Sequence, residues 1–341
     1  MTGQARILFL ADAGAKVGGG HVMRCLTLAE ALIRAGAECA FVAGPAAWVV
    51  LDAFAQAPVE VFPLDEEASA SELAAAGVGV ARRWSASGLV ADHYGFSPGD
   101  DATLAAVCES LLIVDDLRRR HAHGLVLDSN IGRKAGDYPG REVLAGPEFA
   151  LVRPAFAALR TETLARRAQA SPPRRVLVSL GLTDAGAITG RVVRALLPVL
   201  GQAQLDVVVG GAAASRPELE ALARTDHRVR VYVDARDMAG LVAAADIGVG
   251  AGGSSAWERC CLGLPSLTVI VADNQRENTT ALAGEGVTLA IAPPSGDFDA
   301  RLSAAFAKLA ADATLRASMS AAAAALCDGL GADRVANRLL T

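Results

Sequence analysis

The 341-residue sequence has few aromatic side chains, no C-x-x-C motif, no G-K-[ST] motif and no long uninterrupted apolar run. Aromatics make up 4% of the residues, so the 52% that are hydrophobic are mostly Ala, Val and Leu. The missing G-K-[ST] excludes a P-loop, and the lack of about 20 consecutive apolar residues argues against a membrane span. The net charge of −5 gives no general attraction to nucleic acid or to anionic lipid.

The cysteines show no spacing typical of a disulfide framework or a zinc site. They are Cys25, Cys39, Cys108, Cys260, Cys261 and Cys327. We expect them to be buried, reduced side chains, which is typical of the cytoplasm. The first residues lack the basic and long apolar regions of a secretory leader. The sequence therefore predicts a soluble, cytoplasmic protein whose partner is a small molecule rather than nucleic acid or membrane.

Short apolar runs alternate with Ala- and Leu-rich segments that are long enough for helices. The runs predicted as strands are 6–11, 39–43, 59–63, 88–92, 111–116, 175–180, 205–210, 229–234, 245–250, 265–271 and 287–292. Near-continuous apolar strands between helices indicate parallel sheets that are covered on both faces. We therefore predict an α/β protein with two Rossmann-like, doubly wound parallel-sheet domains and a central cleft.

The strand pattern fades between residues 130 and 150, and the stretch "SPPRR" at 171–175 is the best candidate for a linker. This places an N-terminal domain at residues 1–165 and a C-terminal domain at residues 172–341. In such sheets, ligands bind beyond the carboxyl ends of the strands, so the loops at the strand ends are the places to search.

The first of these loops leads into "GGGHVMRCLTLAEAL" at 18–32. It is not a dinucleotide fingerprint, because Met23 stands at the third glycine position and no acid ends the second strand. His21 begins the next helix, where the helix dipole favours a neutral ring that could act as a general base. The residues alone leave open whether His21 does so or only caps the helix. Gly20 leaves room for a ligand, and Arg24 could face a phosphate or solvent.

Two further loops of the first half carry polar side chains. "ADHYGF" at 91–96 places Asp92, His93 and Tyr94 at a strand end, either around a substrate or as an ordinary strand-end cap. "VDDL" contributes Asp115 and Asp116, and paired acids can hold Mg²⁺. Because adjacent side chains diverge, we predict no metal site there.

The densest polar group lies in the second half, within "GAGGSSAWERCCLGLPSLTVIVADNQ" at 250–275. Its candidate nucleotide-binding residues are Gly252, Gly253, Ser254, Ser255 and Glu258. Backbone N–H groups of such a loop can receive a diphosphate, the serines offer N-cap hydroxyls, and the acid lies within reach of a ribose diol. The next strand end adds Asp273, Asn274 and Gln275. Turn chemistry alone remains an alternative for both segments.

Taken in order, these motifs resemble the UDP-sugar hydrolases of pseudaminic acid biosynthesis, which are relatives of GT-B glycosyltransferases. The resemblance extends from about residue 7 to residue 275 and also includes "LDSN", "GPEFALVRPAF" and "SLGLTDAG". It implies cleavage of UDP-2,4-diacetamido-2,4,6-trideoxy-β-L-altropyranose by water, with inversion, and no cofactor or metal. Such enzymes serve the glycosylation of flagellin and other surface structures.

The resemblance assigns the catalytic base to His21 and active-site roles to Tyr94 and Asn274. It assigns UDP to the glycine–serine loop and Glu258, and we place Gly20, Arg24, Asp273 and Gln275 on the substrate side. The residues fit this chemistry, because UDP leaves as a stable anion and needs no proton donor, unlike most glycosidase leaving groups. What remains necessary is a base for the water and donors for the diphosphate.

Two positions depart from the family pattern: Leu10 stands where an arginine is common, and Leu182 replaces a glycine. They bear on which sugar is used more than on the type of reaction. Two alternatives remain: a GT-B-type glycosyltransferase that uses a UDP-amino sugar, and a non-catalytic nucleotide-sugar-binding protein.

Overall fold

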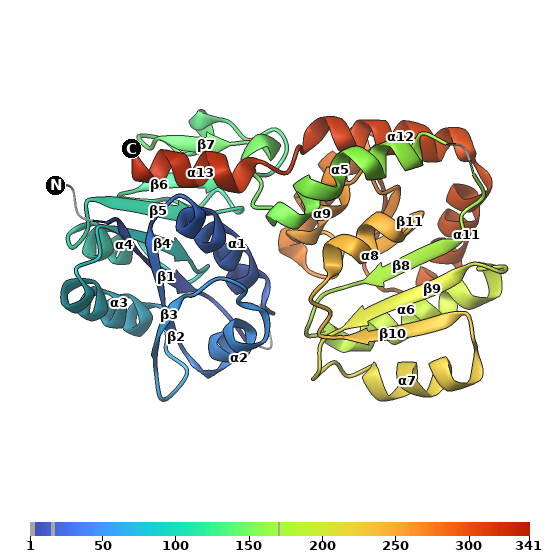
Figure 1. Cartoon of the computed structure of the whole chain (residues 1–341), viewed down its shortest axis with the longest axis horizontal. Helices are drawn as coiled ribbons and strands as arrows, with labels where there is room; N and C mark the ends of the chain where they lie inside the picture. Colours follow the sequence, from blue (N-terminus) through green and yellow to red (C-terminus); the bar gives the residue numbers. More distant parts are fainter. Residues whose placement is uncertain (1–3, 15–17, 170) are drawn as a thin grey trace. The chain divides into compact units, whose positions relative to one another are not determined.

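A computed structural model describes residues 4–14, 18–169 and 171–341, and the chain folds into two compact units (Figure 1). The first unit runs up to Leu151 and includes Leu330–Thr341; the second comprises Val152–Gly329. Each unit is a parallel sheet between helices, so the predicted fold class is observed in both.

The first unit has the strand order β3-β2-β1-β4-β5-β6-β7, with every neighbouring pair parallel. Its strands are β1 (Arg6–Ala11), β2 (Glu38–Ala43), β3 (Glu60–Pro63), β4 (Gly88–Asp92), β5 (Ser110–Val114), β6 (Leu125–Asp128) and β7 (Val143–Ala145). Its helices are α1 (Gly20–Arg34), α2 (Pro45–Phe54), α3 (Ala70–Trp84), α4 (Pro98–Ala105) and α13 (Gly331–Leu340). The short strands β6 and β7 were missed by the sequence analysis, because three or four residues carry too little periodicity.

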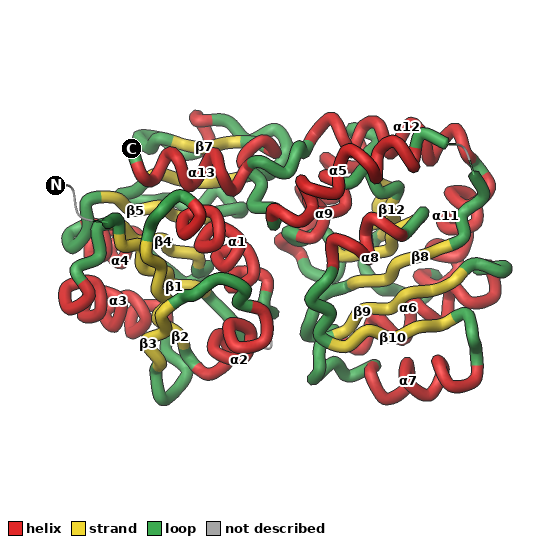
Figure 2. Tube along the Cα trace, in the orientation of Figure 1, coloured by secondary structure: helices red, strands yellow, loops and turns green. Residues whose placement is uncertain are grey.

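Alternating side chains of β1 face two different apolar layers. Phe9 packs in the cluster shared with α1, α2 and α13, whereas Leu8 and Leu10 pack in the cluster shared with α3 and α4. Figure 2 shows this sheet between these helices. The sheet is therefore buried on both faces, and polar side chains gather where its strands end.

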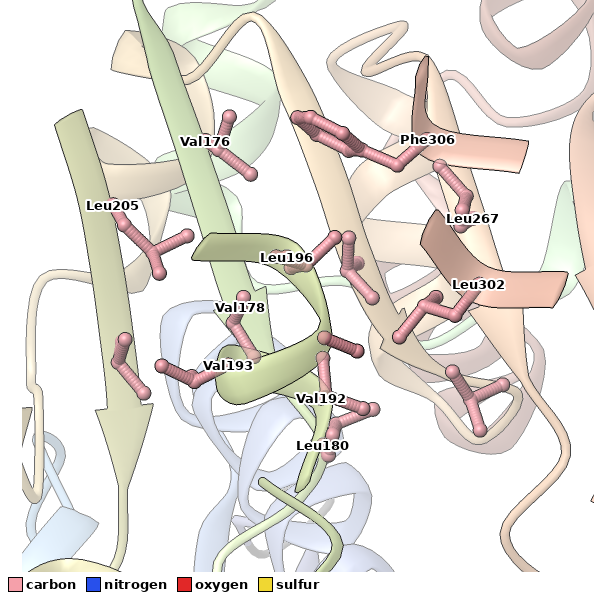
Figure 3. Packing of buried hydrophobic residues seen from close by; sticks show 14 of the residues in the cluster. Val176, Val178, Leu180, Val192, Val193, Leu196, Leu205, Leu267, Leu302 and Phe306 are labelled. Atoms are coloured by element: carbon pink, nitrogen blue, oxygen red, sulfur yellow. The ribbon is translucent and has the colours of Figure 1, made fainter. Parts of the chain in front are cut away.

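The second unit has the strand order β10-β9-β8-β11-β12-β13, again parallel throughout. Its strands are β8 (Arg175–Ser179), β9 (Gln204–Val209), β10 (Val229–Val233), β11 (Ile247–Ala251), β12 (Ser266–Val269) and β13 (Thr288–Ile291). Its helices are α5 (Pro154–Arg167), α6 (Ile188–Leu196), α7 (Arg216–Thr225), α8 (Met238–Ala244), α9 (Ser255–Cys261), α10 (Arg276–Gly284), α11 (Phe298–Ala311) and α12 (Ala313–Leu326). Figure 3 shows how Val176 and Val178 of β8 pack against α6 and α11 in its core.

The unit boundaries differ from those expected from the sequence. The division falls between Leu151 and Val152, ahead of α5, rather than between residues 165 and 172, and α13 joins the first unit. Val335 of α13 lies in the core shared with α1, and Asp333 pairs with Arg34 at 2.6 Å. The last helix leaves the second unit because its apolar stripe is buried against α1, a contact across some 300 residues that local sequence pattern does not reveal.

None of the helices in the described part of the chain has the length and apolar character needed to cross a membrane.

Candidate active site

His21 lies in the first turn of α1, just beyond a glycine-rich loop. Gly14 and Gly18 bond to each other across that loop, and Gly18 has a φ of 72°, which favours glycine. Residues 15–17 between them lie outside the described residues. The helix follows at Gly20, where an added Cβ would meet nothing within 4 Å among the described residues. None of the described residues fills the space expected beside Gly20, and His21, at 5% exposed, is buried.

Asp92 holds the His21 ring in one orientation. It ends β4 beside Ala11 of β1, and its Oδ1 lies 2.6 Å from His21 Nδ1. An ionised carboxylate only accepts hydrogen bonds, so Nδ1 carries the proton in this pair. In the neutral ring, Nε2 is then the nitrogen with a free lone pair, which is the tautomer a general base requires.

Arg24 completes a buried charge cluster rather than facing solvent. Its Nε and Nη2 donate to the two oxygens of Asp92 at 2.5 and 2.6 Å, and its Nη1 donates to Asp116 Oδ2 at 3.0 Å. Burial would raise the pKa of Asp92, but the charge of Arg24, and then that of His21, lowers it below its usual range. Asp92 is therefore ionised at neutral pH and available to support His21.

Tyr94 closes the cluster from the loop after β4. Its ring meets the His21 ring edge-on, with centroids 4.6 Å apart, and its hydroxyl donates to Asp116 Oδ2 at 3.0 Å. The structure thus brings the predicted residues His21, Arg24 and Tyr94 together around two acids, Asp92 and Asp116.

A second histidine lies near this cluster. Gly95 N donates to His93 Nδ1 at 2.9 Å, and His93 Nε2 lies 3.6 Å from Asp12 Oδ1. Burial lowers the pKa of His93 and outweighs the opposing effect of Asp12. His93 is therefore neutral at pH 7, with its proton on Nε2.

The adjacent acids of the VDDL motif diverge, as the sequence analysis expected. Asp115 accepts from His121 Nε2 at 2.8 Å, whereas Asp116 turns toward Arg24 and Tyr94. Within residues 4–14, 18–169 and 171–341, no group of three or more His, Cys, Asp or Glu side chains is arranged to hold a metal ion.

The predicted nucleotide loop lies in the second unit, between β11 and α9. An added Cβ on Gly252 would collide with Thr279 Oγ1 and come within 3.1 Å of Gln275 Cβ, so only glycine fits there. Ser254 stands at the N-cap of α9, yet the structure shows no side-chain capping bond from it among the described residues. The expectation that Ser254 caps α9 with its hydroxyl is therefore wrong for the described residues. The loop is shaped instead by Thr279 and Gln275, which pack against Gly252.

The D-N-Q segment forms a short 3₁₀ turn, Asp273–Gln275, beside that loop. Gln275 Oε1 accepts from Gly252 N at 3.1 Å, so its side chain supports the nucleotide loop. Asp273 is 95% exposed at its side chain and pairs with Arg276 at 2.9 Å. Asn274, between Asp273 and Gln275 in the chain, is exposed. The structure therefore gives Gln275 a positioning contact where the sequence suggested direct contact with substrate.

Glu258 follows on α9, with 17% of its side chain exposed, and accepts from Arg153 Nη2 at 3.1 Å. Below the loop lies Arg259, whose Nη2 donates to the carbonyl of Ala251 at 2.9 Å and whose Nη1 donates to Ser255 Oγ at 3.3 Å. Burial lowers the pKa of Arg259, and the opposing effects of Cys260 and Glu258 do not offset it. Arg259 therefore holds the start of α9 against the end of β11.

Neither departure from the family pattern introduces strain at a strand end. Leu10 is fully buried, and its side chain points toward Gly77 of α3, away from the face that carries α1 and His21. Leu182 has no positive φ; the left-handed residue there is Gly181, at 111°. Leucine is therefore compatible with the backbone at both positions.

Three residues of the clusters received no definite role from the sequence: Asp92, Asp116 and Arg259. Asp92 and Asp116 stand in the quoted strand-end motifs, but only the strand order shows which acid faces α1. Arg259 stands four residues after Ser255, a helical spacing that predicts contact between the two side chains.

The resemblance expected from the motifs is confirmed by two curated relatives. The chain is 23% identical over 290 residues to the UDP-2,4-diacetamido-2,4,6-trideoxy-beta-L-altropyranose hydrolase of Campylobacter jejuni, covering 82% of this chain and 97% of that protein. It is 26% identical over 195 residues to the spore coat polysaccharide biosynthesis protein SpsG of Bacillus subtilis, covering 57% of this chain and 56% of SpsG. The match thus spans little more than half the length of SpsG. No family model matches the chain.

Solved structures confirm the fold over nearly the whole chain. MurG of Acinetobacter baumannii aligns over 99% of both chains with a TM-score of 0.69 at 16% identity. The spinosyn rhamnosyltransferase SpnG, complexed with thymidine diphosphate, aligns over 99% of this chain and 100% of its own with a TM-score of 0.65 at 17% identity. HepE of Anabaena, in complex with UDP and glucose, aligns over 99% of both chains with a TM-score of 0.56 at 16% identity. The chain therefore has the two-domain GT-B fold that the motifs predicted.

Proposed function

We propose that this protein hydrolyses a UDP-linked 2,4-diacetamido-2,4,6-trideoxy sugar to UDP and the free sugar, with His21 activating the water. The observation that carries the proposal is the 2.6 Å contact between His21 Nδ1 and the ionised Asp92. It leaves Nε2 as the proton-accepting nitrogen. The relative from Campylobacter jejuni supports the substrate class, since its name is that of a UDP-sugar hydrolase.

In this mechanism, Nε2 of His21 takes a proton from water while the water oxygen forms a bond to the anomeric carbon. The bond between that carbon and the diphosphate oxygen breaks, and its electron pair leaves with UDP. Asp92 stabilises the imidazolium that forms, as the acid of a catalytic triad does. A single displacement inverts the anomeric configuration. Tyr94, which lies against His21, would contact the sugar.

The second unit would hold UDP on the loop 252–255 and Glu258. Support comes from the shape of the loop: the packing beneath Gly252 brings its backbone close to Gln275 and Thr279. Arg153 would orient Glu258 toward the ribose. The pathway that follows from the resemblance is pseudaminic acid biosynthesis.

The decisive experiment is to follow the purified protein by NMR with a panel of UDP-2,4-diacetamido sugars, with no acceptor present. Hydrolysis releases UDP in every turnover and gives the inverted anomer first. The solved neighbours include a rhamnosyltransferase, so a glycosyltransferase is the second candidate. A transferase would release little UDP until a sugar or lipid acceptor is added, and a binding protein would bind UDP without turning over any sugar of the panel.

The nucleotide loop can be tested by itself with Gly252→Ala. The new methyl group would collide with Thr279 and push the loop outward, and overpacking of this kind typically costs about 1–3 kcal/mol. We expect UDP binding, measured by calorimetry, to weaken about 10- to 100-fold. Gly284→Ala is the matched control, because an added Cβ there meets nothing within 4 Å among the described residues. Equal UDP affinity in the two folded variants would show that UDP binds elsewhere.

A further inference from the structure

A buried histidine, His121, links two carboxylates behind the candidate active site. Its Nδ1 lies 3.1 Å from Asp101 Oδ2 of α4, and its Nε2 lies 2.8 Å from Asp115 Oδ2, just after β5. The three side chains are at most 1% exposed. We propose that His121 is a positioning residue that fixes the loop 115–122 and, through it, sets the place of Tyr94 beside His21. The catalytic part of this inference rests on the proposed function.

His121 is positively charged between its two acids. Two carboxylates facing both ring nitrogens require a proton on each nitrogen, so the ring is an imidazolium. Burial would lower the pKa of His121, but its hydrogen bonds to Asp101 and Asp115 outweigh burial and raise it. Arg119 Nε, 3.4 Å from Asp115, is the other cation at this acid, and the ring of Tyr138 stacks on His121 at 6.3 Å. A neutral ring could satisfy only one of the two acids.

The same two acids, Asp101 and Asp115, hold both ends of the loop 115–122. Asp115 accepts from the backbone N–H groups of Leu117 and Arg119 at 2.7 and 2.8 Å. Asp101 accepts from the N–H group of Ala122 at 3.2 Å. His121 therefore connects the two acids on which the loop backbone depends.

Two sets of contacts connect the loop 115–122 to the candidate active site. Arg119 Nη1 donates to the carbonyls of His93, Tyr94 and Phe96 at 3.1, 3.0 and 3.3 Å, and its guanidinium lies 5.8 Å from the centre of the Tyr94 ring. Asp116 accepts from the Tyr94 hydroxyl and from Arg24. Displacement of the loop would therefore move Tyr94, although His121 touches neither Tyr94 nor His21 in any contact that the described residues show.

The test replaces His121 by glutamine, which is neutral and carries its N–H donors on a single nitrogen, so it cannot replace both ring N–H groups. The protein is labelled with 3-fluorotyrosine, and its three tyrosines, Tyr94, Tyr138 and Tyr232, are assigned by Tyr→Phe substitution. At pH 7 we expect His121→Gln to shift or broaden the ¹⁹F signal of Tyr94. Tyr232, on β10 in the other unit, should not respond. His123→Gln, an exposed histidine two residues further along, is the matched control and should leave Tyr94 unchanged.

The kinetic part uses the same variants. Misplacing a group in an active site by about 1 Å costs roughly 100-fold in rate, so we expect His121→Gln to lower kcat by about 10- to 100-fold. Affinity for UDP should stay within about twofold, because the loop 252–255 lies in the other unit. Asp101→Asn should change the Tyr94 signal and lower kcat as His121→Gln does. It replaces His121→Gln in the test if that variant does not fold.

The outcomes separate the two proposals. An unchanged Tyr94 signal in a folded His121→Gln or Asp101→Asn variant overturns the positioning role, whatever the activity. A displaced Tyr94 signal with unaltered kcat in an active enzyme overturns the catalytic consequence. If the wild-type protein turns over no UDP-sugar, the proposed function fails, while the ¹⁹F comparison still decides whether His121 positions Tyr94.

Discussion

Replacing His21 by asparagine should lower kcat by about 10²- to 10⁴-fold, the range that one proton-transfer group typically contributes. Asparagine can keep a hydrogen bond to Asp92, but it offers no basic nitrogen to the water. Affinity for UDP should stay within a few-fold, since the loop 252–255 belongs to the other unit. Steady-state hydrolysis of the UDP-sugar measures kcat, and calorimetry with UDP measures the affinity for UDP.

The matched control for this variant is His123→Asn, which changes an exposed histidine of the same unit. It should leave both kcat and UDP affinity unaltered. Near-normal turnover by a folded His21→Asn variant would remove His21 as the base.

The position of His21 could be predicted from sequence because a glycine-rich turn between a strand and a helix is a local feature. The partner of His21 could not. The motif "ADHYGF" offers neighbouring residues that could pair with it, such as Asp92 and His93, and successive side chains of a strand point to opposite faces. Asp92 is selected by the pairing of β4 with β1, which places it beside Ala11 and beneath α1. Strand order is a long-range property, so the sequence pattern alone could not supply it.

The second unit shows the same division between local and long-range information. The strands and the glycine–serine loop were predicted, because apolar runs and glycines are local signals. The contact of Gln275 with Gly252 was not, since it spans 23 residues and two strand ends. A polar side chain at a strand end can face a ligand or a neighbouring loop, and residue type does not distinguish the two.

Asp92→Asn should remove activity by a different route and also destabilise the fold. An asparagine amide can donate to His21 Nδ1, which would leave the proton on Nε2 and give the wrong tautomer. A comparable change in a catalytic triad lowers kcat about 10⁴-fold, and we expect a loss of roughly 10³- to 10⁴-fold here. Arg24 would also lose its main counter-charge in a buried place, which typically costs about 3–5 kcal/mol. Asp52→Asn, which changes an exposed residue of α2, is the control and should alter neither kcat nor the free energy of unfolding.

The dependence of stability on pH distinguishes this charge effect from a simple packing defect. The pKa of Asp92 is lower in the folded protein than its value of about 3.9 in an unfolded chain. The contribution of the ionised Asp92 to the free energy of unfolding is therefore fully present above that value. It is lost as the pH falls through the lower pKa of the folded protein. In urea unfolding, the difference in the free energy of unfolding between the wild type and Asp92→Asn should be constant above about pH 5. It should become smaller below about pH 4. Asp115, whose pKa is lowered to about 2 chiefly by its bond to His121 against the effect of burial, remains in both proteins. If the difference in the free energy of unfolding is the same at pH 3 and pH 7, then asparagine disturbs the packing of the cluster, and the charge of Asp92 does not stabilise the fold.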